Sequence, residues 1–198
     1  VDADSLVFAS CYRKRETPED EKYYTDIADA RNKFDEQFMA IVNRLEELYN
    51  VDKVLCFSGS KGNFRKILSS TDDMVARYWF NISQDLGRDN VMIVSIDKDY
   101  RQFPCLMYNY HYKHKEILDI SEDEAMYNFY EQMIMGDTAD NVNFFRGKGK
   151  RFAEQYFVDC QTKYQYTRKM FELFKREYKG KARQKYAECY HLLKLRTN

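Results

Sequence analysis

The apolar run Val91-Met92-Ile93-Val94-Ser95-Ile96 constrains the fold of this chain more than any other stretch. Such a run favours a central strand of a parallel sheet, which is buried on both faces. Further strand patterns are seen at 1–8, 53–57 and 106–110, and helical patterns at 20–50, 72–86 and 122–135. Because strands and helices alternate, the sequence predicts an α/β fold with a parallel sheet flanked by helices.

After Asn141 the composition changes. Residues 144–198 hold 15 basic and 5 acidic side chains, whereas residues 1–143 hold 17 basic and 27 acidic ones. Helical patterns in this last part cover 151–159, 164–178 and 181–193. The sequence therefore predicts a core domain at 1–141 and a basic helical region at 142–198. An acidic body with a basic end fits a protein that holds cations in one place and polyanions in another.

Seven aspartates lie in short, separated stretches, most of them beside strand-like or apolar runs. They are Asp2, Asp72, Asp73, Asp97, Asp99, Asp137 and Asp140. In a parallel sheet the ligand site lies outside the carboxyl ends of the strands. Carboxylates gathered there repel one another unless hard cations neutralise them, although any single pair is more often a local turn feature. The pattern predicts a divalent-metal site and, with it, phosphate chemistry.

The segment Arg146-Gly147-Lys148-Gly149-Lys150-Arg151 places two glycines among four basic residues. At the start of a helix, such glycines can expose backbone N–H groups to a phosphate. Taken alone, the segment is more often a solvated turn. The many tyrosines of the last region can stack on bases, but at helical spacing packing is the more common role.

Five widely spaced cysteines, with no Cys-x-x-Cys pair, indicate neither a disulfide framework nor a zinc site. Their presence favours a reducing compartment, so we expect a cytoplasmic protein. No apolar run approaches the length of a membrane span, so we expect no membrane partner.

Gly136-Asp137-Thr138-Ala139-Asp140-Asn141, followed by the glycine-basic segment, resembles the signature of the 5′ nucleases, which are flap endonucleases and 5′→3′ exonucleases. Asp97-Lys98-Asp99-Tyr100-Arg101-Gln102 resembles that family's Asp-Lys-Asp-x-x-Gln motif, and Thr71-Asp72-Asp73 resembles its Glu-Ala-Asp-Asp helix start. Asp2 resembles the first-strand aspartate, and residues 56–66 resemble the second-strand motif with its trailing Phe-Arg. The resemblance covers residues 1–160 and is strongest to phage-encoded 5′→3′ exonucleases.

The resemblance implies a PIN-like parallel sheet whose aspartates hold two divalent ions, Mg²⁺ or Mn²⁺. It implies that Lys61 and Arg65 approach the scissile phosphate as catalytic residues. Residues 146–151 would form the turn of a helix-three-turn-helix that grips duplex phosphates, a turn that also binds K⁺ in relatives. The implied activity of this monomer is hydrolysis of duplex or branched DNA at 5′ ends and flaps, and of RNA–DNA hybrids. The implied setting is replication, primer removal or recombination, in the host cytoplasm if a phage encodes it.

Two features depart from the family pattern. Ser58, Gly59 and Ser70 stand where relatives carry acidic residues, and only residues 66–70 separate Arg65 from Thr71, where relatives have a helical arch. Either the arch residues are missing from this sequence, or the protein has no arch. The departures keep two alternatives open. One is a catalytically weakened DNA-structure-binding protein on the same fold, and the other is a PIN-type ribonuclease, which should lack the helix-three-turn-helix.

Overall fold

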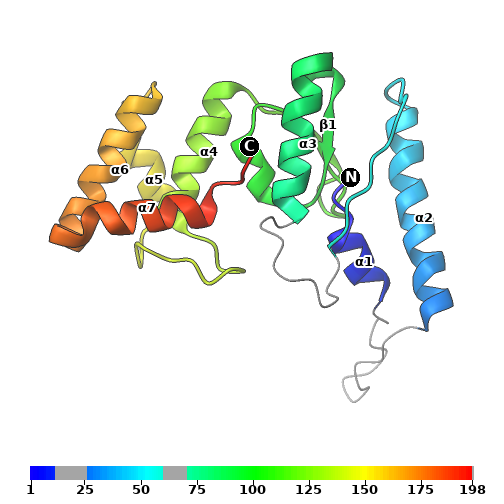
Figure 1. The fold of residues 1–198 in the computed structure, drawn as a ribbon, viewed down its shortest axis with the longest axis horizontal. Helices are drawn as coiled ribbons and strands as arrows, with labels where there is room; N and C mark the ends of the chain where they lie inside the picture. The colour runs from blue at the N-terminus through cyan, green and yellow to red at the C-terminus, as the bar shows by residue number, and fades with distance from the viewer. Residues whose placement is uncertain (12–25, 60–70, 198) are drawn as a thin grey trace.

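The computed structural model describes residues 1–11, 26–59 and 71–197. Within these ranges the chain is an α/β protein whose small mixed sheet is flanked by helices (Figure 1). The sheet with α1, α2 and α3 forms one half of the molecule, and α4 to α7 form the other half beside it (Figure 1). Lys61, Arg65 and Ser70 lie outside the described residues.

The elements, in chain order, are α1 (Asp4–Ser10), α2 (Ile27–Glu46), α3 (Thr71–Leu86), η1 (Arg88–Asn90), β1 (Met92–Val94), η2 (Lys98–Gln102), β2 (Leu106–Asn109), β3 (Glu116–Asp119), α4 (Glu122–Met135), α5 (Lys150–Tyr156), α6 (Lys163–Tyr178), η3 (Lys179–Lys181) and α7 (Ala182–Leu193). Local capping explains two of these starts. A reciprocal pair of side-chain to backbone hydrogen bonds joins Ser121 and Glu124 ahead of α4, and another joins Thr162 and Gln165 ahead of α6.

The sheet has the order β1-β2-β3. β1 and β2 run parallel, as the apolar pattern predicts, and pair Ile93 with Met107. β3 was not predicted, and it pairs antiparallel to β2, so the sheet is mixed rather than wholly parallel. The connection from Asn109 to Glu116 explains the direction, because it is far shorter than the dozen or more residues that a parallel crossover needs.

Residues 1–3 extend the sheet on the other side of β1. The Asp2 amide donates to the Val94 carbonyl at 2.9 Å, and the Ala3 amide donates to the Phe57 carbonyl at 2.8 Å. The expected strand at 1–8 is therefore wrong beyond Ala3, because α1 begins at Asp4. The expected strand at 53–57 is reduced to the single parallel bridge between Phe57 and Asp2.

α2 covers Ile27–Glu46 of the helix predicted at 20–50, of which residues 20–25 lie outside the described residues. Asp26 caps its start by accepting a hydrogen bond from the Ala28 amide, and the helix ends at Glu46. Ile41 and Leu45 are buried on the expected face. Leu48 lies beyond the end of the helix and is exposed. The apolar face of α2 therefore packs on α1 and the sheet, with Phe34 and Phe38 partly buried against the same core.

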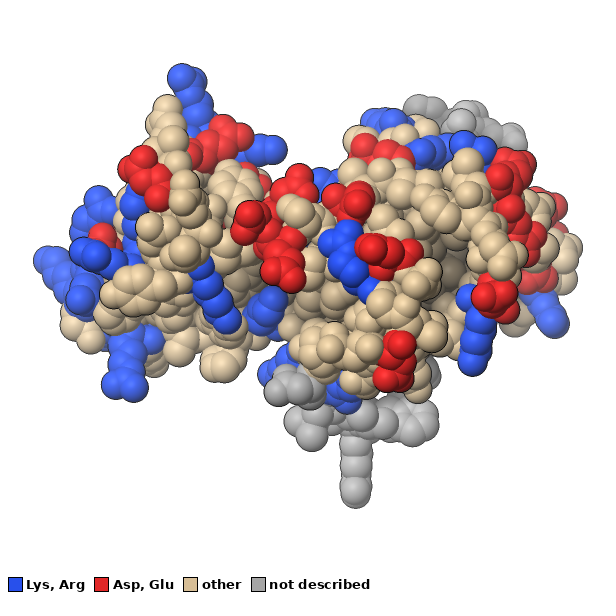
Figure 2. All heavy atoms as spheres, turned by 90° about the horizontal axis from the view of Figure 1, so that it is seen from above, with Lys and Arg blue, Asp and Glu red and all other residues tan. Residues whose placement is uncertain are grey.

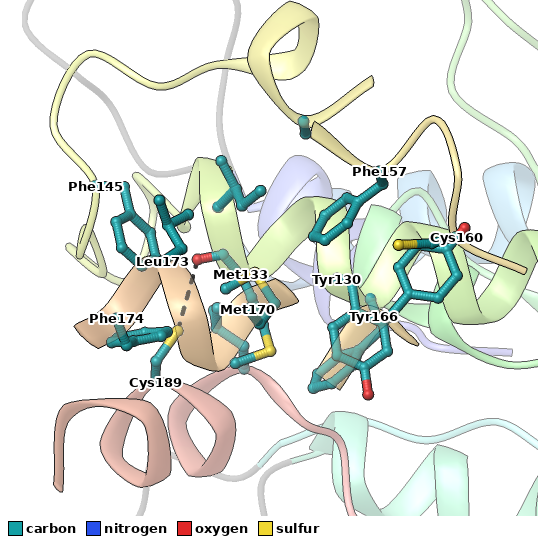
Figure 3. Packing of buried hydrophobic residues seen from close by; sticks show 14 of the residues in the cluster. Tyr130, Met133, Phe145, Phe157, Cys160, Tyr166, Met170, Leu173, Phe174 and Cys189 are labelled. Atoms are coloured by element: carbon teal, nitrogen blue, oxygen red, sulfur yellow. Dashed lines mark hydrogen bonds between the residues drawn. The ribbon is translucent and has the colours of Figure 1, made fainter. Parts of the chain in front are cut away.

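The largest apolar core lies among α4, α5, α6 and α7 (Figure 3). Met133, Met170 and Phe174 are fully buried at its centre, and the Cys189 thiol contacts the Met133 carbonyl. Tyr166 is buried in this core, and Tyr156, Tyr178, Tyr186 and Tyr190 pack against it, which confirms packing as the role of these tyrosines. Tyr164 is 73% exposed and does not share that role.

A C-terminal strap, residues 194–197, connects the two halves. The buried Gln102 side chain donates to the Leu193 carbonyl and accepts from the Leu195 amide, both at 3.1 Å. The Arg196 amide then donates to the Asp73 carboxylate at 2.8 Å. The strap therefore ties the end of α7 to η2 and to the first turn of α3; Figure 1 shows it leaving the end of α7 toward the sheet half.

None of the helices in the described ranges is both long and apolar enough to cross a membrane. All five cysteines lie in those ranges, and each is a free thiol.

We expect Gly136→Ala to lower the free energy of unfolding by about 1–3 kcal/mol, as measured by urea denaturation. Gly136 has a φ of +74°, and a Cβ there would lie 2.1 Å from the Val142 carbonyl oxygen. Gly149→Ala is the control, since a Cβ there meets no atom within 4 Å. Equal stabilities of the two variants would contradict the expectation.

Candidate functional site

Carboxylates from four separate parts of the chain meet at the carboxyl end of β1. Asp2 lies within the short pairing of residues 1–3, and Asp97 and Asp99 lie after β1, at the start of η2. Asp72 lies in the first turn of α3, and Asp137 begins the turn after α4. We call these five residues together with Asp4 the acidic site.

Asp2 lies at the centre of the hydrogen-bond network. Its side chain is buried, and its Oδ2 accepts from the Ser95 hydroxyl at 3.0 Å. The Tyr100 hydroxyl lies 3.4 Å from the same oxygen and 3.0 Å from Asp72 Oδ1. The Asp97 amide in turn donates to the Ser95 hydroxyl oxygen at 3.0 Å. These contacts connect the first strand, the start of α3 and the loop after β1.

Asp97 and Asp99 are held by η2 and α4. Asp97 caps η2 by accepting from the Asp99 amide at 2.8 Å. Gln132 of α4 donates to Asp99 Oδ1 at 2.7 Å. The conformation of this loop therefore depends on the packing of α4 against η2.

Asp137 is buried next to this loop. The Ala139 amide donates to its carboxylate at 2.8 Å, and the Lys98 ammonium group lies 3.3 Å from its Oδ2. Gly136 allows the backbone to turn here. Its positive φ lets the turn close through paired hydrogen bonds between Asp137 and Val142, which places the Asp137 side chain at the site.

Burial and, after it, repulsion from neighbouring carboxylates raise the pKa values of Asp72, Asp97 and Asp99. Burial raises the pKa of Asp72 to about 6, and the charges of Asp97, Asp2 and Asp4 add to the shift. Burial, with Asp97 and Asp137, raises the pKa of Asp99 to about 7. The pKa of Asp97 is raised for the same two reasons, with Asp2 and Asp137 as the neighbours. Burial followed by Asp2 and Asp72 raises the pKa of Tyr100, which therefore stays a hydrogen-bond donor at neutral pH.

Two of the predicted metal ligands, Asp73 and Asp140, do not belong to the acidic site. Asp73 follows Asp72 directly, but its carboxylate accepts from the Arg196 amide of the strap. Asp140 is exposed on the turn after α4. The predicted catalytic residues Lys61 and Arg65 lie outside the described residues.

Sequence reasoning missed Asp4 of the acidic site. It also missed three residues that contact the carboxylates of the site, namely Ser95, Lys98 and Tyr100. All four lie inside or next to motifs that were singled out for their aspartates. The available signal was the position of Asp4 two residues after Asp2, and of Tyr100 directly after Asp99. Their roles depend on contacts between distant parts of the chain, which the sequence does not display.

The chemistry of the acidic site suits a hard cation, but its geometry is not that of a formed metal centre. Its ligand atoms are carboxylate oxygens, which Mg²⁺ and Mn²⁺ prefer. Lys98 forms an ion pair with one of its carboxylates, Asp137. Over the described ranges, however, no three acidic, histidine or cysteine side chains are arranged to hold one ion. The donor set therefore fits a divalent cation, whose binding requires the carboxylates to draw closer together.

The glycine-basic segment follows Val142 and continues into α5, whose first two residues are Lys150 and Arg151. Gly147 has a φ of +78°, and a Cβ at Gly147 or Gly149 would meet no atom within 4 Å. Arg146, Lys150 and Arg151 are exposed. Lys148 is less available, because its ammonium group pairs with Glu177 at 2.8 Å.

Exposed basic residues continue from this segment onto the last helices. Figure 2 shows Lys and Arg gathered at the end of the molecule that α6 and α7 form. They include Arg168, Lys175, Arg176, Lys179, Lys181 and Arg183. This surface has the charge that a polyanion requires.

Comparison with known protein families and with curated proteins gives no match to this chain.

We expect the contribution of Asp72 and Asp99 to the free energy of unfolding of the metal-free protein to fall as the pH rises from about 4 to 7. Their folded pKa values of about 6 and about 7 exceed the usual 3.8, so the folded state binds more protons than the unfolded state in this window. Asp99→Asn should make the dependence shallower and should raise stability at pH 7. Urea denaturation in EDTA at pH 5, 6 and 7 measures this.

Asp85→Asn, at an exposed position in the last turn of α3, is the control for that measurement. The expectation fails if both variants keep the pH dependence of the wild-type protein.

Proposed function

We propose that this chain is a metal-dependent 5′→3′ exonuclease and structure-specific flap endonuclease on a PIN-like fold. One observation carries the proposal. Aspartates distant in sequence, in stretches that resemble the 5′-nuclease motifs, meet at the carboxyl end of a parallel strand pair. This is where a phosphodiesterase on an α/β sheet holds its ions.

The acidic site supplies the ligands for two divalent ions. Asp72 interacts electrostatically with Asp97, Asp2 and Asp4, and Asp99 interacts with Asp97 and Asp137, so Asp97 is common to both groups. When bound, such ions activate water and stabilise the leaving oxygen of the phosphodiester. The protein's own contribution is to hold the carboxylates in place and to keep Lys98 beside Asp137.

Asp4 offers a replacement for one acid that is missing from the family pattern. The Gly59 amide donates to Asp4 Oδ1 at 2.5 Å, so this carboxylate lies beside Ser58 and Gly59, where relatives carry an acidic residue. A side chain at Gly59 would come within 3.1 Å of the Asp4 carboxylate. An acid from α1 thus takes the place of one from the second strand.

The basic surface is proposed to hold duplex DNA through its phosphates. Arg146, Lys150 and Arg151 extend into solvent around the open backbone of Gly147 and Gly149, and α6 and α7 continue the positive charge (Figure 2). Contacts of this kind position a duplex without reading its bases. The DNA bound to the basic surface would then extend to the acidic site.

We expect Asp97→Ala and Asp137→Ala to abolish cleavage of a 5′-flap substrate in Mg²⁺ or Mn²⁺ while DNA affinity is retained. Both side chains belong to the acidic site and neither belongs to the basic surface. Single-turnover cleavage and fluorescence anisotropy measure the two properties. Asp85→Ala is the matched control and should cleave normally. Full turnover by Asp137→Ala would show that the metal site is misplaced.

We expect Arg151→Ala to weaken DNA binding about equally for all sequences and to reduce the slope of log K against log salt by about 1. Lys148→Ala should do the same to a smaller extent, because Glu177 already neutralises that lysine. Lys53→Ala, an exposed change in the acidic half, is the control. An unchanged salt dependence in Arg151→Ala would remove the segment from the DNA interface.

A specific observation favours a second candidate, a DNA-structure-binding protein with weakened catalysis. Lys98 already pairs with Asp137, and no three-ligand group is formed among the described residues. Flap substrates at high protein concentration separate the two functions. Binding without cleavage in both Mg²⁺ and Mn²⁺ supports the second candidate, and cleavage in either metal excludes it.

A further inference from the structure

Tyr100 lies beneath the acidic site and is completely buried. Its hydroxyl lies 3.0 Å from Asp72 Oδ1 and 3.4 Å from Asp2 Oδ2. A phenol has one proton to donate, so two carboxylates from distant parts of the chain share a single donor. A buried hydroxyl in this position constrains two carboxylates in addition to packing in the core.

Ser95 completes the arrangement on the Asp2 side. Its hydroxyl donates to the same Asp2 oxygen at 3.0 Å and accepts from the Asp97 amide at 3.0 Å. Tyr100 itself belongs to η2, which Asp97 caps. Two hydroxyl groups, those of Tyr100 and Ser95, therefore link Asp2 to Asp72 and to the Asp97 backbone.

We propose that Tyr100 is a positioning residue that presents Asp2 and Asp72 to one shared cation, with Ser95 as its partner on Asp2. The inference rests on the proposed metal-dependent function. A hydrogen bond to one carboxylate oxygen fixes the direction of the other oxygen. On Asp2 this other oxygen, Oδ1, accepts from the Asp4 amide at 3.3 Å and keeps a second lone pair that an ion can use. Groups that hold ligands in this way typically raise metal affinity by about 10- to 100-fold.

A purely structural role makes a different prediction, and Tyr130 provides the comparison. Tyr130 is 2% exposed, and its hydroxyl pairs with the Thr167 hydroxyl at 2.6 Å in the helical core. Tyr130→Phe therefore removes one buried phenolic hydroxyl, as Tyr100→Phe does, without touching a carboxylate. If Tyr100 only stabilises the fold, the two variants should behave alike toward metal.

Calorimetric titration of Mn²⁺ into the wild-type protein, Tyr100→Phe and Tyr130→Phe tests the proposal. We expect Tyr100→Phe to bind Mn²⁺ about 10- to 100-fold more weakly and Tyr130→Phe to match the wild type. Cleavage of a 5′-flap substrate by Tyr100→Phe should be slow at low Mn²⁺ and recover at saturating Mn²⁺. Its DNA affinity in EDTA should not change.

Equal Mn²⁺ affinities of Tyr100→Phe and Tyr130→Phe would overturn the positioning role while leaving the proposed function intact. A wild-type protein that binds no Mn²⁺ would overturn the proposed function, and the positioning role with it. If Tyr100→Phe does not fold, Ser95→Ala decides the question. Weakened Mn²⁺ binding by that variant supports the proposal, and wild-type affinity overturns it.

Discussion

The pairing of residues 1–3 between Phe57 and β1 is the constraint on which the acidic site depends. The hydrogen bond from the Asp2 amide to the Val94 carbonyl places the Asp2 side chain next to the loop that follows β1. Asp97 and Asp99 can approach it only because that loop starts at the same end of the parallel pair. Without this pairing, the carboxylates would belong to unrelated surfaces of the molecule.

The same arrangement sets function against stability. Burial and, after it, neighbouring carboxylates raise the pKa values of Asp72 and Asp99, so their ionisation lowers the stability of the metal-free fold at neutral pH. A bound cation would relieve that cost. The fold tolerates the repulsion because apolar cores stabilise both halves: two lie around the sheet, one of them containing Tyr100, and a larger one lies among α4 to α7. The strap then fixes the helical half, with its basic surface, against the half that carries most of the acids.

Local patterns predicted α4 well. Its apolar face and the Ser121 cap are encoded within the helix and the residue before it, and the observed bounds Glu122–Met135 match the prediction. β3 was missed because Glu116–Asp119 has no strong strand pattern of its own and is a strand only through its pairing with β2. The strand expected at 1–8 was wrong beyond Ala3, because α1 begins at Asp4 and buries Leu6 while Val7 and Phe8 stay exposed.

The sequence by itself determined the kinds of residue at the site and their order, since an aspartate directly after an apolar strand must emerge at its carboxyl end. Only the tertiary structure decided which aspartates meet. Asp72 and Asp73 are neighbours in the chain, yet successive residues on a helix face different directions, so one joins the acidic site and the other holds the strap. Asp4, Ser95 and Tyr100 became part of the site through contacts across the sheet, which no local pattern encodes.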